Sequence, residues 1–326
     1  MLAASVLLLA AVAWGATHVS LAPHSAPAAA LPVPGEAAAA HADQGKPAVL
    51  AASDPLEASQ ALLNPPYSWD YRWLAAHPAV GVPANRAAAA LLVDVDSRHV
   101  LFDRKSHARM PLASTTKLTT AMVALDSVGP DTTVTVPAEA VIVEPNVMGL
   151  SAGEQLTVRE LLYGLLLDSG NDAAETLAAT TMVGGRRAFL KAMNVKSAAL
   201  GLTDTQFVNP SGLDDPEQYS SAHDLALTAA YLYRHYPVIE KVVTTKEEAL
   251  SYGPSHKAFY PYNLNKMLWT YPGAIGFKTG LTDAAGEVFV GGAHRGSHTL
   301  VVVEMNDPLI FSDAAALLDY GFRRAG

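Results

Sequence analysis

The sequence predicts an α/β fold in which a single sheet is assembled from two segments that lie far apart in the chain. Strand-like segments occur near residue 90 and again beyond residue 270, and the stretch between them has helical spacing. This arrangement implies one five-stranded antiparallel sheet, flanked by helices, with a helical region inserted. With 326 residues, the chain is long enough to bury a sizeable core.

The first two strands form a predicted hairpin. Ala87–Val95 is apolar and ends in the polar run Asp94–Ser97, and His99–Arg104 alternates between apolar and polar residues. Two strand-like runs joined by a short polar turn are typical of a β-hairpin.

The other three strands are predicted at Ala274–Thr279, Glu287–Ala293 and Thr299–Met305. The last two flank His294–Ser297, which is again a turn signal. Ser312–Phe322 follows them and places its apolar residues on one stripe, so it is predicted to be a helix.

The inserted region is predicted to be mostly helical. Two of its helices begin with a capping signal, Thr157 with Glu160 and Ser221 with Asp224, in which an acidic residue follows a hydroxyl residue by three positions. Helical spacing is found in Leu118–Leu125, Val158–Leu167, Ala173–Met182, Arg186–Ala199 and Leu225–Tyr236.

The N-terminal part of the sequence has a different character. Leu2–Trp14 is apolar and fits the hydrophobic region of a secretion signal, although no Lys or Arg precedes Lys46. We expect residues 1–19 to be a signal peptide or an N-terminal membrane anchor, and the Ala/Pro-rich residues 20–85 to be a largely irregular linker. The folded domain is then expected to span residues 86–326.

The composition excludes several classes of function. The 22 basic and 31 acidic side chains give a formal net charge of −9, which makes the chain a poor partner for nucleic acid. The sequence has no cysteine, so disulfides, thiolate nucleophiles and Cys-based zinc sites are excluded.

The first of three motifs suited to catalysis is Ser114-Thr115-Thr116-Lys117, at the start of a predicted helix. The spacing puts the Ser114 hydroxyl and the Lys117 amine on one helical face, where a neutral lysine could take the proton of the serine. A capping serine followed by an exposed lysine has the same pattern.

The second motif is Ser169-Gly170-Asn171, between two predicted helices. Gly170 permits a sharp loop that would direct both polar side chains into a cleft, where they could relay a proton or hold an amide. An ordinary capping loop is the alternative interpretation.

The third motif is Lys278-Thr279-Gly280, at the end of a predicted strand. Lys278 would supply a cation for a substrate carboxylate and would lower the pKa of a neighbouring amine. Gly280 would let a substrate backbone approach the strand closely. An exposed lysine at a sheet edge is the alternative interpretation.

In this order, the three motifs resemble those of class A β-lactamases and penicillin-binding proteins. The surrounding segments narrow the resemblance to the low-molecular-mass penicillin-binding proteins, the D-alanyl-D-alanine carboxypeptidases, over roughly residues 86–322. These segments begin at Pro111, Met148, Asp168, Asn209, Asn265 and Gly276.

The resemblance implies a β-lactamase/transpeptidase-like fold and a serine acyl-enzyme mechanism that needs no cofactor. Ser114 would attack the bond between the last two D-alanines of a peptidoglycan stem peptide, and Lys117 would take its proton. Ser169 and Asn171 would assist proton transfer and orient the substrate. Residues 86–326 would then be a penicillin-binding D,D-peptidase catalytic domain.

The resemblance also implies a substrate-binding set on the third motif. Lys278 and Thr279 would hold the terminal carboxylate, with Gly280 and Leu281 beside the substrate. The backbone N–H groups of Ser114 and Leu281 would form the oxyanion hole.

Two departures from the family pattern bear on these expectations. Many relatives carry an arginine near the carboxylate site at the position of Ile310, so carboxylate binding is expected to depend on Lys278 and Thr279. Many also continue into a β-rich domain and a membrane helix, whereas this sequence ends at Gly326. Any membrane attachment is therefore expected through the N-terminal segment.

Other activities fit the sequence less well than the carboxypeptidase. A class A β-lactamase also carries Glu-x-x-Leu-Asn, but Gln60 and Pro261 stand three positions before the two Leu-Asn pairs, so this activity is disfavoured. A D,D-endopeptidase acting on cross-links stays open. A non-catalytic binding protein is disfavoured by the intact first motif. A metal site at His294 and His298 is disfavoured because these residues flank a predicted turn.

The expected partners follow from the same resemblance. Peptidoglycan stem peptides would be the substrates and β-lactam antibiotics the covalent inhibitors, with no nucleic-acid partner. The protein is expected outside the cytoplasm, either secreted or anchored by its N-terminal segment on the cell-wall side of the membrane.

Overall fold

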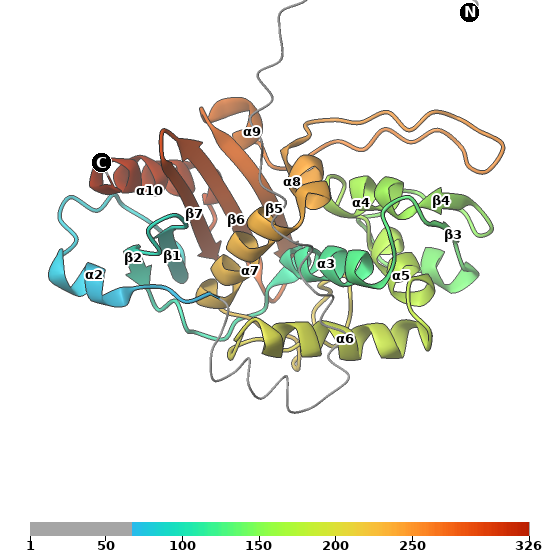
Figure 1. The fold of residues 1–326 in the computed structure, drawn as a ribbon, viewed down its shortest axis with the longest axis horizontal. Coiled ribbons are helices and arrows are strands. Elements are labelled where there is room, and N and C mark those ends of the chain that lie inside the picture. Colours follow the sequence, from blue (N-terminus) through green and yellow to red (C-terminus); the bar gives the residue numbers. More distant parts are fainter. Residues whose placement is uncertain (1–66, 326) are drawn as a thin grey trace, which may run out of the picture. The chain divides into compact units, whose positions relative to one another are not determined.

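The computed structural model describes residues 67–325, and these contain one five-stranded antiparallel sheet (Figure 1). Its strand order is β2-β1-β7-β6-β5. The strands are β1 (Ala89–Asp94), β2 (Val100–Arg104), β5 (Ala274–Thr282), β6 (Gly286–Arg295) and β7 (His298–Met305). Because β1 pairs with both β2 and β7, the predicted sheet from two distant segments is confirmed.

Helices cover both faces of this sheet (Figure 1). Helix α10 (Ile310–Ala325) packs against β1, β6 and β7, whereas α7 (Ala222–His235) and α8 (Pro237–Thr244) pack on the opposite face. Successive residues of β1 alternate between the two layers: Leu91 belongs to the core beneath α7 and Leu92 to the core beneath α10. Every residue of β1 is buried, as expected for a strand covered on both sides.

The inserted region is built around helix α3 (Lys117–Ser127). Its residues Lys117–Ala124 are all buried, because neighbouring helices contact it on several sides. Those neighbours include α4 (Val158–Leu166), α5 (Asn171–Thr180), α6 (Gly185–Ala199) and α7. Every helix that the spacing predicted is present, within a few residues of its expected ends.

Several short elements were not predicted. They are η1 (Ala113–Thr116), η2 (Ala138–Val141), α9 (Met267–Thr270) and the paired strands β3 (Thr133–Thr135) and β4 (Gln155–Thr157). Helix α8 was also not predicted; it follows α7 directly, with Pro237 at its first position.

The two capping signals have different outcomes. The Thr157 hydroxyl accepts a hydrogen bond from the Glu160 N–H, and the Glu160 carboxylate accepts one from the Thr157 N–H, so this capping box is confirmed. Ser221 caps α7 by accepting from the Asp224 N–H. The Asp224 carboxylate instead accepts from the backbone N–H of Asp204, so the reciprocal bond of the second box is not made.

The described part of the expected linker packs on the domain. Tyr67 and Trp69 are each only 7% exposed, and the Tyr67 hydroxyl donates to the Val95 carbonyl at 2.5 Å. Asp70 caps the short helix α2 (Tyr71–Ala76) and exchanges backbone hydrogen bonds with the turn between β1 and β2. The folded unit thus begins before the expected boundary at Arg86, because the aromatic residues after the Ala/Pro-rich stretch bury apolar area.

Among residues 67–325, no helix is both long and apolar enough to cross a membrane. The segment expected to be a signal peptide or anchor, residues 1–19, lies outside the described residues, as do residues 20–66 of the expected linker.

Candidate active site

Ser114 lies on the single turn η1, immediately before helix α3. Thr115 and Thr116 fix this turn, since their hydroxyls donate to the carbonyls of Leu112 and Ala113 at 2.6 and 2.9 Å. The Ser114 side chain is left partly exposed at the wall of a cleft.

Lys117 follows one turn later and is completely buried. Its Nζ contacts three oxygen atoms: Ser114 Oγ at 2.9 Å, Asn171 Oδ1 at 2.7 Å and the Ser211 carbonyl at 2.6 Å. Burial, followed by the positive charge of Lys278, holds the pKa of Lys117 well below its ordinary value. A neutral Lys117 in hydrogen-bond contact with a serine hydroxyl can act as a base.

The loop that supplies the Ser211 carbonyl is held by Asn209. The Asn209 Oδ1 accepts from the N–H groups of Ser211 and Gly212 and from the Gln218 side chain. Gly212 has φ +91° and passes so close to the turn of Ser114 that a Cβ atom would lie 1.9 Å from the Ala113 carbonyl oxygen. Only glycine fits there, so the loop can reach Lys117. The sequence pattern placed these residues in the resemblance but assigned them no role.

The second motif connects α4 to α5 and brings Asn171 to the same lysine. The Asn171 amide nitrogen donates to the carbonyls of Glu144 and Pro145 at 2.8 and 3.3 Å, which directs its Oδ1 at Lys117. Ser169, only 4% exposed, also lines the cleft.

The sharp turn of this motif is made by a different residue from the one expected. Ser169 adopts φ +65°, whereas Gly170 has an ordinary φ of −60°. Gly170 is needed for space instead, because a Cβ atom would lie 2.9 Å from Asp172 Oδ1 and 3.0 Å from the Met148 nitrogen.

Asp172 supports the site from beneath and was not singled out from the sequence. Its buried carboxylate accepts hydrogen bonds from the backbone N–H groups of Met148, Gly149 and Leu150 at 2.8, 2.8 and 2.9 Å. These bonds hold the segment after Glu144 against the start of α5. Its position directly after Asn171, in the second motif, was the sequence signal that could have pointed to it.

The third motif lies within β5, which continues to Thr282 beyond the expected strand end. Lys278 is 1% exposed, so it is not an exposed edge lysine; its Nζ donates to the Thr279 carbonyl at 3.0 Å. Burial lowers the pKa of Lys278 to about 7, opposed by the negative charge of Asp168. The predicted effect of Lys278 on the pKa of a neighbouring amine is supported at Lys117, where it comes second to burial.

Gly280 lines the cleft, where a substrate backbone is expected to approach, and it also has a packing role. A Cβ atom on Gly280 would lie 2.9 Å from both the Ala113 Cβ and the Ser114 nitrogen. Its missing side chain therefore lets the turn of Ser114 pack directly against β5.

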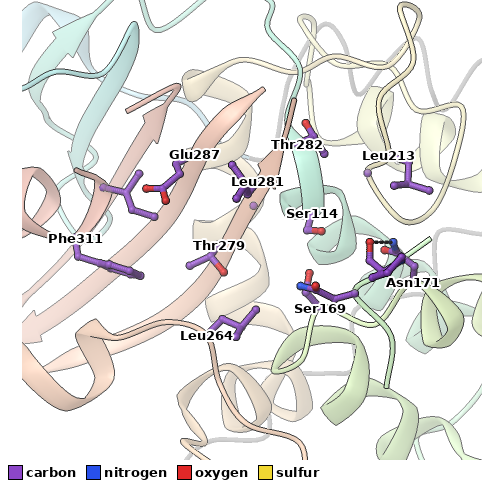
Figure 2. A pocket seen from close by; sticks show the side chains of 15 residues that line it. Ser114, Ser169, Asn171, Leu213, Leu264, Thr279, Leu281, Thr282, Glu287 and Phe311 are labelled. Carbon is purple, nitrogen blue, oxygen red and sulfur yellow. Dashed lines mark hydrogen bonds between the residues drawn. The ribbon is translucent and has the colours of Figure 1, made fainter. Parts of the chain in front are cut away.

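These segments surround a cleft of about 290 Å³, into which Ser114, Ser169, Thr279 and Leu281 point (Figure 2). Lys117 and Lys278 lie buried behind its walls. The lining residues are Ser114, Pro145, Asn146, Ser169, Asn171, Gly212, Leu213, Leu264, Thr279, Gly280, Leu281, Thr282, Glu287, Ile310 and Phe311. Among the sites predicted from the sequence, the cleft thus unites the Ser114, Ser169 and Thr279 motifs.

The histidines near the C-terminal strands have ordinary partners. His298 Nδ1 lies 2.8 Å from Asp94 Oδ2, and His294 Nδ1 lies 3.0 Å from Thr299 Oγ1. Within the part of the chain that the structure describes, no group of three or more His, Asp or Glu side chains is arranged to hold a metal ion.

Comparison with known proteins gives consistent results. Residues 76–308 match the family model described as D-alanyl-D-alanine carboxypeptidase. A D-alanyl-D-alanine carboxypeptidase of Mycobacterium tuberculosis is 39% identical over 252 residues, covering 75% of this chain and 85% of that protein. One of Bacillus subtilis is 33% identical, covering 68% of this chain but only 57% of its own length.

Other similar proteins are named for different activities. A protein of Pseudomonas aeruginosa that is 34% identical, over 65% of this chain and 70% of its own, is named a D-alanyl-D-alanine endopeptidase. The crystal structure of a Streptomyces DD-transpeptidase superposes with a TM-score of 0.71 and 30% sequence identity, covering 75% of this chain and 100% of that one. The predicted transpeptidase-like fold is confirmed by this similarity.

Proposed function

The chain belongs to the family of D-alanyl-D-alanine carboxypeptidases, and we propose that it removes the terminal D-alanine from peptidoglycan stem peptides through an acyl-enzyme on Ser114. The family predicted from the three motifs is confirmed. The observation that carries the proposal is the 2.9 Å contact between Lys117 Nζ and Ser114 Oγ, made by a lysine whose pKa is lowered by burial.

In the first half of the reaction, neutral Lys117 takes the proton of Ser114 while Ser114 Oγ attacks the carbonyl carbon of the scissile amide. The C–N bond then breaks, a proton passes to the leaving amine, and D-alanine departs. Ser169, on the opposite wall of the cleft, is suited to relay that proton. Water then attacks the acyl-enzyme ester and restores the Ser114 hydroxyl.

Substrate binding would use strand β5. Thr279 faces the cleft and can donate its hydroxyl to the terminal carboxylate, while the charge of Lys278 acts from behind the wall. The backbone N–H groups of Ser114 and Leu281 would stabilise the oxyanion. Asn171 would orient the substrate and Lys117 together, because its oxygen contacts the lysine while its residue lines the cleft.

Two experiments test this function. Labelled penicillin should form a covalent adduct visible by intact-mass measurement, and Ser114→Ala should form none. A Ser114→Ala protein that labels fully would contradict the nucleophile. Ser127→Ala, on the surface end of α3, is a matched serine control and should label like the unmodified chain.

Product analysis separates the carboxypeptidase from an endopeptidase. Free D-alanine should appear from a pentapeptide, whereas a cross-linked muropeptide should be cleaved slowly. The endopeptidase is kept as a second candidate because one relative carries that name. In addition, the family resemblance leads us to expect arginine at the position of Ile310, which has no charge to offer a terminal carboxylate. Faster cleavage of the cross-linked substrate would favour it.

We also propose that the protein acts on the cell-wall side of the cytoplasmic membrane, as a secreted or N-terminally anchored enzyme with a role in cell shape. The apolar run Leu2–Trp14 and the peptidoglycan substrate support this location. Fractionation of cells should find the protein in the membrane or outside the cytoplasm. Recovery of an active, unprocessed chain in the cytoplasmic fraction would contradict it.

A further inference from the structure

The cleft extends past Thr279, on the side away from Ser114, to Glu287 and Phe311 (Figure 2). Glu287 lies on β6 directly opposite Leu281 of β5, so the two side chains point to the same face of the sheet. Ile310 completes this part of the lining, and both it and Phe311 belong to the first turn of α10.

Glu287 supplies a carboxylate at this end of the cleft. It is partly exposed at the cleft and forms no ion pair within residues 67–325. The ammonium of Lys266 lies 5.9 Å from the centre of the Phe311 ring, but Lys266 is exposed and is not among the residues that line the cleft. Asp283, in the turn that joins β5 to β6, adds an exposed negative charge nearby.

We propose that Glu287, Ile310 and Phe311 form a subsite for the side chain of the leaving residue, and that this subsite selects D-amino acids with a long aliphatic side chain ending in a cation, such as D-lysine. The inference rests on the proposed function, which places the leaving residue beside Thr279. Neighbouring strands lie about 4.8 Å apart, so the methyl group of D-alanine at β5 is too short to reach a carboxylate on β6. A lysine side chain can span this distance.

The chemistry of the subsite matches such a side chain in two ways. Ile310 and Phe311 offer apolar surface to the methylene groups, and the Glu287 carboxylate accepts hydrogen bonds from the ammonium. The reaction is unchanged: an acyl-D-Ala-D-Lys peptide and water give acyl-D-Ala and free D-lysine. The subsite alters only which leaving residue is bound well.

Three synthetic peptides test the charge preference. They carry the same acyl-D-Ala group and end in D-lysine, D-norleucine or D-glutamate, so that norleucine supplies the aliphatic chain without the charge. We expect kcat/KM, measured from the released D-residue by mass spectrometry, to favour D-lysine over D-norleucine about fivefold at low ionic strength, equivalent to about 1 kcal/mol for a partly exposed ion pair. D-glutamate should be the poorest, and added salt should shrink the preference.

Variants assign the preference to its residue. Glu287→Gln should bring the ratio of D-lysine to D-norleucine close to one, and Glu287→Lys should favour D-glutamate over D-lysine. Glu139→Gln, at an exposed carboxylate of η2 that does not line the cleft, should keep the native ratio. Each ratio is taken within one variant, so a general loss of activity does not change it.

Two results would overturn the subsite. Equal kcat/KM for D-lysine and D-norleucine in the unmodified protein would show that Glu287 does not act on the leaving residue. A preference for D-glutamate would instead assign the site to Lys266. If the protein releases no D-residue from all three peptides and none from a D-Ala-D-Ala peptide, the proposed function itself is contradicted.

Discussion

The side-chain nitrogen of Lys117 lies 2.9 Å from the hydroxyl oxygen of Ser114, and its two other contacts are both to carbonyl oxygens, Asn171 Oδ1 and the Ser211 carbonyl. A neutral amine has two N–H donors and one lone pair. If the two carbonyls accept the two N–H groups, the lone pair faces Ser114. The Asn171 side-chain amide and the Ser211 carbonyl would thus aim the base at the nucleophile.

Lys117→Arg should abolish acylation by penicillin. A guanidinium stays protonated and cannot accept the serine proton, so loss of general-base assistance should slow acylation by about 100- to 10,000-fold. The rate is measured by intact mass over time. Lys191→Arg, on the exposed side of α6, is the matched control and should acylate normally. Near-normal acylation of Lys117→Arg would remove the lysine from this role.

Lys278→Gln should shift the pH dependence of acylation. Acylation requires neutral Lys117, so the rate should rise with pH through the pKa of that lysine. Because the charge of Lys278 lowers the pKa of Lys117, its removal should move the rise to higher pH and slow acylation most at pH 6. A rate profile from pH 5 to pH 9 measures this. An equal loss at every pH would mean that Lys278 acts only in binding.

Asp172→Asn should destabilise the domain. The asparagine keeps one acceptor oxygen but turns an N–H group toward backbone donors, so hydrogen bonds to the segment Met148–Leu150 are lost. We expect the free energy of unfolding to fall by about 2–4 kcal/mol in urea titrations. Asp131→Asn removes only an exposed ion pair with Arg159 and should cost less than about 1 kcal/mol. Equal effects of both changes would contradict the buried role.

The sequence predicted the strands, the main helices and the three motifs because each depends on local spacing. Features that arise from contact between distant segments could not be predicted from the sequence. The approach of Gly212 to Ala113 and the burial of Lys278 both require segments that are remote in the sequence to pack together. The burial of Tyr67 and Trp69 was missed for the same reason, since the Tyr67 hydroxyl bonds to the carbonyl of Val95, which lies 28 residues later in the chain.

Removal of all residues before Pro83 should destabilise the domain. The truncation deletes Tyr67, Trp69 and α2, and loss of one large buried aromatic side chain typically costs about 3–5 kcal/mol. Compared with a chain that starts at residue 67, the melting temperature should fall by more than about 5 °C. Val80→Ala, at a side chain that is 82% exposed, should have little effect. An unchanged melting temperature would restore the boundary near Arg86.

A buried carboxyl pair near the C-terminal end of β7 links the stability of the domain to pH. Glu304 of β7 is fully buried, and its Oε1 accepts from the Asn85 amide at 2.7 Å. Within residues 67–325, Glu304 Oε2 and Asp307 Oδ2 have no hydrogen-bond partner. Burial first, and the negative charge of Asp307 second, raise the pKa of Glu304 to about 9.

Glu304→Gln should make the domain less sensitive to alkaline pH. The folded state holds the Glu304 proton up to about pH 9, whereas the unfolded state releases it near its ordinary pKa, so stability falls as pH rises between these values. Glutamine imitates the protonated acid and removes this loss. Urea titrations at pH 5 and pH 8.5 should show a smaller decrease for the variant than for the unmodified chain. An equal decrease would mean that Glu304 is ionised when folded.

The order of strands in the sheet also determines when this protein can become an enzyme during its synthesis. Strand β1 leaves the ribosome together with the serine of the first motif, but its partner β7 begins only at His298 and is made much later. Until then β1 has an unpaired edge, and the wall of the cleft formed by β5 does not exist. Pairing over such a long separation in sequence is slow and leaves apolar surface open to aggregation. A nascent chain should therefore not react with penicillin until β5, β6 and β7 have emerged, so that Ser114 stays unreactive until the sheet is assembled.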